Sequence, residues 1–202
     1  SKETLANIVA LEKNFGVAAE GAVKVNKIFQ SIGGLSEQAS QALVSQTVEA
    51  AKLVGVAPDR VIKDLADNAE TAAMFFQGSV GDLAKAAVEA ARLGTSITQA
   101  AKVAEGLLDF ENSITAELEA SAMLGQSINF NKARELAAQG DILGAQQATL
   151  SELEKKVDLD NLNFFQLQSI AKASGMEVSE LQNQLNLRKQ FGPLNDAQKA
   201  AL

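Results

Sequence analysis

Apolar residues recur every three or four positions along most of the chain, and glycine stands where these runs stop. This spacing places apolar side chains on one face of a helix, and glycine suits the left-handed residue that ends many helices. The predicted helices cover residues 36–54, 58–68, 79–94, 98–124, 132–139, 142–156, 163–174 and 179–190. No useful stretch alternates with the period of a strand. The pattern predicts an all-α fold, a compact array of about nine to eleven short to medium helices around one longer central helix, with helix-turn-helix connections.

The residues at the predicted helix ends support these limits. Ser36 is a candidate N-cap, Ser79 with Asp82 resembles a capping box, and Gly140-Asp141 can stop one helix and cap the next. The residues expected on the inner faces of the second and third predicted helices are Val44, Val48, Ala51, Val61, Ile62 and Leu65. Short helices joined by tight turns are therefore expected.

Residues 98–124 form the longest predicted helix. Its inner face is expected to hold Val103, Leu107, Phe110, Ile114 and Leu118, and its wet face Lys102, Glu105, Asp109 and Asn112. Gly106 inside this helix costs roughly 1 kcal/mol relative to alanine. It would let a neighbouring helix cross closely.

The polar stretch VDLDNLN, residues 157–163, is the clearest candidate boundary. We predict an N-terminal helical segment over 1–35, a main helical domain over 36–157, and a helix-turn-helix-like subdomain with a tail over 158–202. No apolar run approaches the roughly 18 residues of a membrane span. The beginning at Ser1 rather than Met favours a piece of a longer, soluble chain.

Composition limits the chemistry that the chain can perform. The 202 residues are 47% hydrophobic, with much alanine, and contain no His, Cys, Trp or Tyr. The usual neutral-pH base and every thiol nucleophile are therefore missing. We predict that the chain is not an enzyme and that it has no catalytic, cofactor-binding or metal-binding residues. The net charge of −7 opposes a general affinity for nucleic acid or anionic membranes.

Two segments share an internal pattern. The segment AKLVGVAPDRVIKDL from Ala51 and the segment AKASGMEVSELQNQL from Ala171 place glycine and later apolar residues at the same spacing. Each predicts a helix, a glycine turn and a second helix, as in helix-turn-helix proteins. A DNA-binding regulator is thus an alternative, in which Gln182, Asn183, Gln184 and Asn186 read base edges. Because residues 176–202 carry as many acids as bases, we favour packing over DNA binding.

Other candidate sites have simpler explanations. The acids Asp109, Glu111, Glu117 and Glu119 are expected to form a solvated face, since a helix-bundle metal site would need histidine. A carboxylate-based cell-wall hydrolase is the least supported alternative. The Gly-Ser-Val-Gly at 78–81 is a turn rather than a phosphate loop. Phe75-Phe76 and Phe164-Phe165 could form an exposed docking patch, but we favour core positions.

The region from Val80 to Ala148, with the strings GLLDFENSI, LEASAMLGQSIN and KARELAAQGD, resembles a helical region of bacteriophage tail tape-measure proteins. The resemblance covers about a third of the chain and continues weakly through SIAKASGMEVSELQNQL. It implies a virion protein in the lumen of the phage tail, made in the bacterial cytoplasm, that sets tail length and organises assembly. The implied partners are tail-tube and baseplate proteins, together with a threefold or sixfold homo-oligomer. The resemblance implies no active site. A tape measure is long and largely continuous helix, so this glycine-punctuated chain would be one compact section of it.

Overall fold

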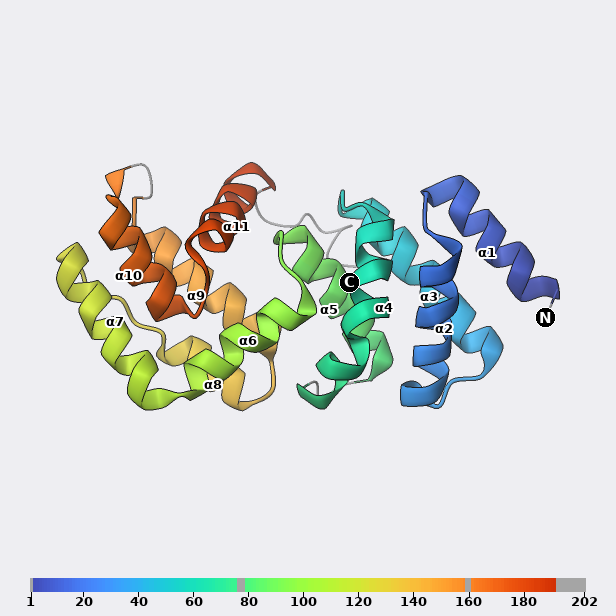
Figure 1. Ribbon diagram of the computed structural model, residues 1–202, viewed down its shortest axis with the longest axis horizontal. Coiled ribbons are helices and arrows are strands. Elements are labelled where there is room, and N and C mark those ends of the chain that lie inside the picture. Colours follow the sequence, from blue (N-terminus) through green and yellow to red (C-terminus); the bar gives the residue numbers. More distant parts are fainter. Residues whose placement is uncertain (1, 76–78, 159–160, 192–202) are drawn as a thin grey trace. The chain divides into compact units, whose positions relative to one another are not determined.

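The computed structural model describes residues 2–75, 79–158 and 161–191. Within these ranges the chain forms eleven α-helices and no strand, which confirms the all-α prediction (Figure 1). The helices are α1 (Lys2–Phe15), α2 (Ala19–Gly33), α3 (Glu37–Leu53), α4 (Pro58–Phe75), α5 (Val80–Arg92), α6 (Ile97–Leu108), α7 (Phe110–Leu124), α8 (Asn131–Ala138), α9 (Ile142–Lys156), α10 (Phe164–Ser174) and α11 (Val178–Phe191).

The helices belong to two compact units. Helices α1 to α5 form the first unit and helices α6 to α11 the second, with the division between Arg92 and Leu93. This division differs from the domain limits expected at 35/36 and 157/158, which stay predictions. Each unit has its own buried apolar residues, as expected for helices that each present one apolar face.

In the first unit, α4 packs against α2, α3 and α5, and α1 packs against α2 and α3. The predicted inner residues of α3 and α4 are all buried: Val44, Val48, Ala51, Val61, Ile62 and Leu65. Helix α4 continues to Phe75, beyond the end predicted near residue 68. Alanines supply much of the buried face of α5, so helices approach closely where the chain offers few large side chains.

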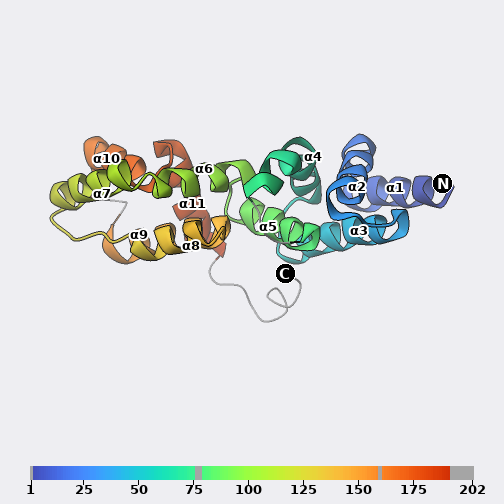
Figure 2. The same cartoon turned by 90° about the horizontal axis from the view of Figure 1, so that it is seen from below.

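In the second unit, α8 and α9 form one layer and α7 and α10 another (Figure 2). Helix α6 contacts α7, α8, α9 and α10 and so joins the two layers. The largest fully buried side chains of this unit are Ile97, Leu107, Phe130, Leu150, Leu153, Ile170, Leu181 and Leu185. They come from four helices, α6, α9, α10 and α11, and from the residue before α8, so these elements share one apolar core.

The predicted caps are present. The Ser36 hydroxyl accepts a hydrogen bond from the Ala39 backbone N–H, and the Asp141 carboxylate accepts one from Gly144. Ser79 and Asp82 form the predicted reciprocal pair: the Ser79 hydroxyl accepts from the Asp82 N–H, and Asp82 accepts from the Ser79 N–H and hydroxyl. The hydrogen bond from the Ser79 hydroxyl lowers the pKa of the Asp82 carboxyl, and the bond from the Ser79 backbone N–H lowers it further by a smaller amount.

The long central helix is not confirmed, because residues 98–124 form two helices that meet at Asp109. The Asp109 N–H still bonds to Glu105 of α6, while its carboxylate accepts from the backbone and side chain of Asn112 in α7. A residue with ψ 76° cannot continue a helix. Aspartate thus ends one helix and caps the next, as its short acceptor side chain favours.

The close crossing predicted at Gly106 is present. A Cβ atom added at Gly106 would lie 3.8 Å from the Cα of Gly175, so the end of α10 approaches the backbone of α6. Gly175 is left-handed, with φ 70°.

The two segments that share a sequence pattern also share a turn geometry. The Val56 N–H donates to the Ala51 carbonyl and the Met176 N–H donates to the Ala171 carbonyl, each at 2.9 Å. Both turns therefore close in the same way.

Among the helices of the described ranges, none is long and apolar enough to cross a membrane.

Candidate interaction surface

Helix α7 carries a stripe of exposed apolar side chains, which we call the α7 stripe: Phe110, Ile114 and Leu118. Their side chains are 52%, 44% and 64% exposed. Because every fourth residue of a helix lies on nearly the same face, the three form a continuous line over about two turns, or roughly 12 Å. These residues were predicted to lie inside, and that prediction is wrong.

The break at Asp109 explains the difference. In an unbroken helix the apolar face of α6, with buried Val103 and Leu107, would continue into Phe110. After the break, α7 instead buries Ser113, Ala116 and Ala120. Helix α7 packs mainly on α10, while Ser113 lies against Arg134 of α8. The large side chains of α7 are left on the outside.

A buried ion pair fixes α7 against the beginning of α8. The Arg134 guanidinium lies 2.8 Å from the Glu117 carboxylate, with side chains only 5% and 12% exposed. Arg134 also donates to the Ser113 hydroxyl at 3.0 and 3.1 Å and to Asn131 at 3.0 Å. Glu117 further accepts from the Phe130 backbone N–H at 2.8 Å. Both charges are therefore extensively hydrogen-bonded, which a buried pair requires.

Three of the four acids around α7 have separate partners. Asp109 caps the helix, Glu117 pairs with Arg134, and Glu119 lies 3.2 Å from Lys172 of α10. Glu111 is exposed in the first turn, where the helix dipole favours an acid. In the part of the chain that the structure describes, no group of three or more potential ligands could hold a metal ion. Glu117 and Glu119 are thus each paired with a cation, and the exposed acids at the beginning of the α7 stripe are Asp109 and Glu111.

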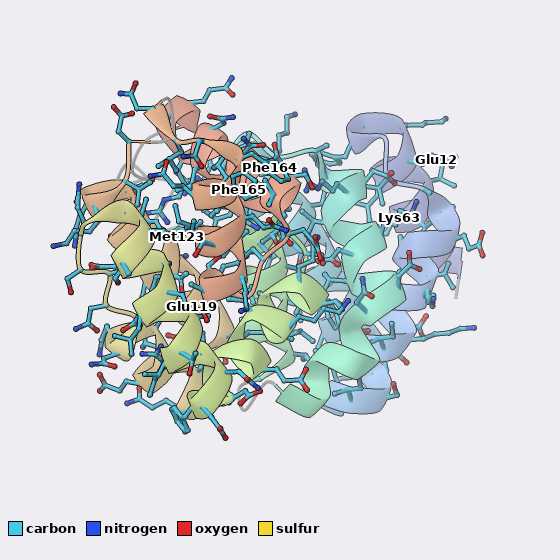
Figure 3. The ribbon with its side chains drawn as sticks, turned by 60° about the vertical axis from the view of Figure 1, so that its left-hand side comes forward. Glu12, Lys63, Glu119, Met123, Phe164 and Phe165 are labelled. Carbon is cyan, nitrogen blue, oxygen red and sulfur yellow. The ribbon has the colours of Figure 1, made fainter. Side chains whose placement is uncertain are left out.

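A second exposed apolar feature lies at the beginning of α10, where Phe164 and Phe165 are 64% and 68% exposed. Their rings stand edge to face, with centroids 6.0 Å apart. The Gln166 side chain donates to the Met123 backbone carbonyl, so this diphenylalanine lies beside the end of α7 (Figure 3). The interpretation of Phe164-Phe165 as core is wrong. Phe76, and the side chain of Phe75, lie outside the described residues.

A ring of four polar side chains holds α11 in the second unit. The Gln146 amide donates to Thr95 at 3.3 Å and to Gln184 at 3.0 Å. Thr95 and Gln184 in turn lie 3.2 and 2.7 Å from the same oxygen of Glu180. Gln184 is fully buried in this ring. It is thus engaged inside the protein, whereas the DNA-binding alternative would need it at the surface to contact a base.

The ring makes the stability of the fold depend on pH. Burial raises the pKa of Glu180 above its ordinary value of 4.5, against the hydrogen bonds from Thr95 and Gln184, which lower it. The folded state therefore holds this proton more tightly than the unfolded state, and the resulting stability is present below pH 4.5 and lost as pH rises through the higher folded pKa. Glutamine at this position still accepts both hydrogen bonds but carries no charge.

We therefore expect Glu180→Gln to raise the thermal unfolding midpoint at pH 7, and the gain over the wild type to shrink toward pH 4. Circular dichroism at several pH values measures this difference. Because the comparison is between two proteins at each pH, the titration of the other acids largely cancels. An equal gain at both pH values would contradict a titrating Glu180.

Sequence reasoning missed the α7 stripe, the buried ion pair and the polar ring. One local signal for the stripe was present, because Asp109 and Asn112 have the spacing of an N-cap and its third helical residue. The partners in the ion pair are 17 residues apart, and three of the four contacts in the ring join residues 38 to 85 apart. No local pattern reveals such pairs.

The fold and its exposed surfaces define an all-helical protein of two units that presents apolar side chains outward. Comparison of the chain with known protein families, with curated proteins and with solved structures found no match.

Proposed function

We propose that this chain is a section of a phage tail tape-measure protein that helps to set tail length and organise tail assembly. It has no catalytic role in this proposal. The α7 stripe is the surface by which it docks on a tail-tube or baseplate protein.

The observation that carries the proposal is where the tape-measure-like strings fall in the fold. GLLDFENSI spans residues 106–114, the end of α6 and the beginning of α7, and LEASAMLGQSIN spans residues 118–129. All three residues of the α7 stripe and the capping Asp109 lie in these strings, and the ion-pair residue Glu117 lies in the short gap between them. The segment that resembles a tail protein is thus the segment that exposes an apolar face.

The physical character of the α7 stripe also supports a protein partner. A line of three large apolar residues on a helix is the side-chain arrangement that helical ligands present to an apolar groove. Burying each such side chain contributes about 1.5–3 kcal/mol. Because the exposed acids Asp109 and Glu111 lie at the beginning of the stripe, a complementary groove carries Lys or Arg at that end, and nucleic acid is a poor partner.

We expect the double variant Ile114→Gln/Leu118→Gln to bind the tail partner at least about 100-fold more weakly, since the two lost side chains together contribute about 3 kcal/mol or more. Both positions are exposed, so the free energy of unfolding should change by less than about 1 kcal/mol in total. Sedimentation velocity of the chain with purified tail-tube and baseplate proteins measures the binding.

The matched control is Leu53→Gln, which removes an equally exposed leucine from α3 in the first unit. It should bind as the wild type does. A wild-type chain that stays monomeric at high concentration, and unbound with every tail-tube and baseplate protein, would contradict the proposal. Fluorescence anisotropy with random and selected duplex DNA at low salt provides the complementary test, and tight binding there would favour the regulator instead.

A further inference from the structure

The first unit contains a mainly apolar groove, and none of the described residues that line it is charged. It lies between the end of α2, one face of α3 and the beginning of α5, and it has a volume of about 610 Å³. The main lining side chains are Ile32, Leu35, Ala39, Ala42, Leu43 and Val80, and the polar ones are Gln46 and Ser79. Its volume falls within the roughly 300–1,000 Å³ of ligand pockets.

Two glycines form part of the lining of this groove. Gly33 and Gly81 are in its lining, and neither carries a side chain. Gly33 also packs directly on Val80, because a Cβ atom at Gly33 would collide with the Val80 side chain. The end of α2 and the beginning of α5 are thus in close contact at one edge of the groove. On the opposite side, the groove is bordered by the exposed and short side chains of Ala39 and Ala42 in α3.

The second unit has a projection of matching character in the diphenylalanine, Phe164-Phe165. Its two rings are more than half exposed and stand edge to face. The residues beside it, Asn163 and Gln166, are uncharged and are occupied with each other in a capping box. Neither the diphenylalanine nor the capping box carries a charge.

We propose that the diphenylalanine of one copy inserts into the apolar groove of a second copy. This inference specifies the self-association that belongs to the proposed function, and it adds the surfaces that make it. A chain with net charge −7 repels its copies over most of its surface, whereas two uncharged apolar surfaces can meet without bringing like charges together. A second copy is the partner favoured here because one chain supplies both halves of the contact.

The geometry of this contact determines the kind of assembly. Because the two surfaces are different, the contact is heterologous, and each copy keeps one free groove and one free diphenylalanine. Such a contact closes into a ring where its rotation allows, as a threefold or sixfold assembly requires, and otherwise extends into a chain. Two phenylalanines bury about 300–500 Å² on their own side, which is a small interface, so we expect weak association that grows with concentration.

The experiment uses two variants of the full chain. Phe164→Ala/Phe165→Ala removes the projection, and Ala42→Glu places a charge in the groove at an exposed helix position. Sedimentation velocity over a concentration series should show that the wild type assembles, that each variant alone stays monomeric, and that an equimolar mixture of the two forms dimers and nothing larger. The mixture stops at dimers because each dimer has one intact contact and no second one.

The result that would overturn the inference is a mixture that stays monomeric, or either variant assembling as the wild type does. A wild type that is monomeric throughout overturns it as well. Circular dichroism checks that both variants fold, and Leu118→Gln is the matched control that should still assemble. Loss of the mixed dimer with retained binding to a tail protein contradicts only this inference, whereas mixed dimers without any tail-protein binding contradict only the proposed function.

Discussion

Replacing Arg134 with methionine should destabilise the second unit by about 3–5 kcal/mol, the usual cost of leaving a buried charge without its partner. Methionine keeps much of the volume of the arginine side chain but supplies none of its donors. Glu117, 12% exposed, would lose its cation and keep only the Phe130 N–H. Ser113 would lose both guanidinium bonds. Urea unfolding followed by far-UV circular dichroism measures the loss, since the chain has no tryptophan.

The matched control is Lys132→Met, which breaks an exposed pair on the same helix. Lys132 and Glu135 lie 2.9 Å apart, but their side chains are 66% and 55% exposed. Such pairs contribute about 0–1 kcal/mol. The double variant Arg134→Met/Glu117→Leu should recover much of the stability, because no buried charge is then left alone. Equal losses for Arg134→Met and Lys132→Met would show that burial of the pair does not matter.

Gly94→Ala should destabilise the same unit by about 2–3 kcal/mol. Gly94 has φ 75°, and an L-residue in the left-handed region costs about 1–2 kcal/mol. A Cβ atom there would also collide with the Leu187 side chain and lie 3.1 Å from the Asn183 amide nitrogen, both on α11. Both contacts are with the ends of flexible side chains that can shift, so we place the added cost near the lower end of the usual range of about 1–3 kcal/mol for overpacking, at about 1 kcal/mol. We expect α11 to shift outward, with faster amide hydrogen exchange along it.

Gly125→Ala separates the two causes. Gly125 has φ 65°, but a Cβ atom there would meet nothing within 4 Å. It should therefore cost only the backbone strain of about 1–2 kcal/mol and leave hydrogen exchange in α11 unchanged. If Gly94→Ala costs no more than Gly125→Ala, then α11 does not pack tightly on the turn before α6.

Local signals in the sequence were sufficient for most of the helices. Ser36, Asp141 and Asn163 cap helices where an acceptor side chain precedes an apolar run, and Gly55 and Gly175 end helices in the left-handed conformation. These features depend on residues at most a few positions apart. The alanine-rich composition also anticipated close helix approach, which Gly106 and Gly175 show.

The candidate surface could not be predicted in the same way. Apolar spacing across Asp109 looked continuous, because Leu107, Phe110 and Ile114 fit one helical period. The helical spacing of apolar residues shows which of them share a face only where they belong to one unbroken helix. Whether an apolar face is covered depends on which helix lies against it, and here α7 packs mainly on α10 while its small residues are the buried ones. Exposure of Phe164 and Phe165 follows likewise from their place at the beginning of α10.

The ion pair connects the stability of the second unit with its proposed function. It holds α7 to the beginning of α8 through Glu117, on the helix that carries the α7 stripe. A rigid helix loses little conformational entropy when it docks, which strengthens binding for a given contact area. Loss of Arg134 should therefore weaken binding to a tail protein as well as stability.

The most direct test of the docking proposal is site-specific photocrosslinking from position 114. A photoreactive amino acid replaces Ile114 in the α7 stripe, or Gln168 on an exposed face of α10 as the control, and the chain is irradiated with purified tail-tube and baseplate proteins. We predict crosslinks from position 114 to one of these proteins and few from position 168. Crosslinks of equal yield from both positions, or none from position 114, would contradict docking through the α7 stripe.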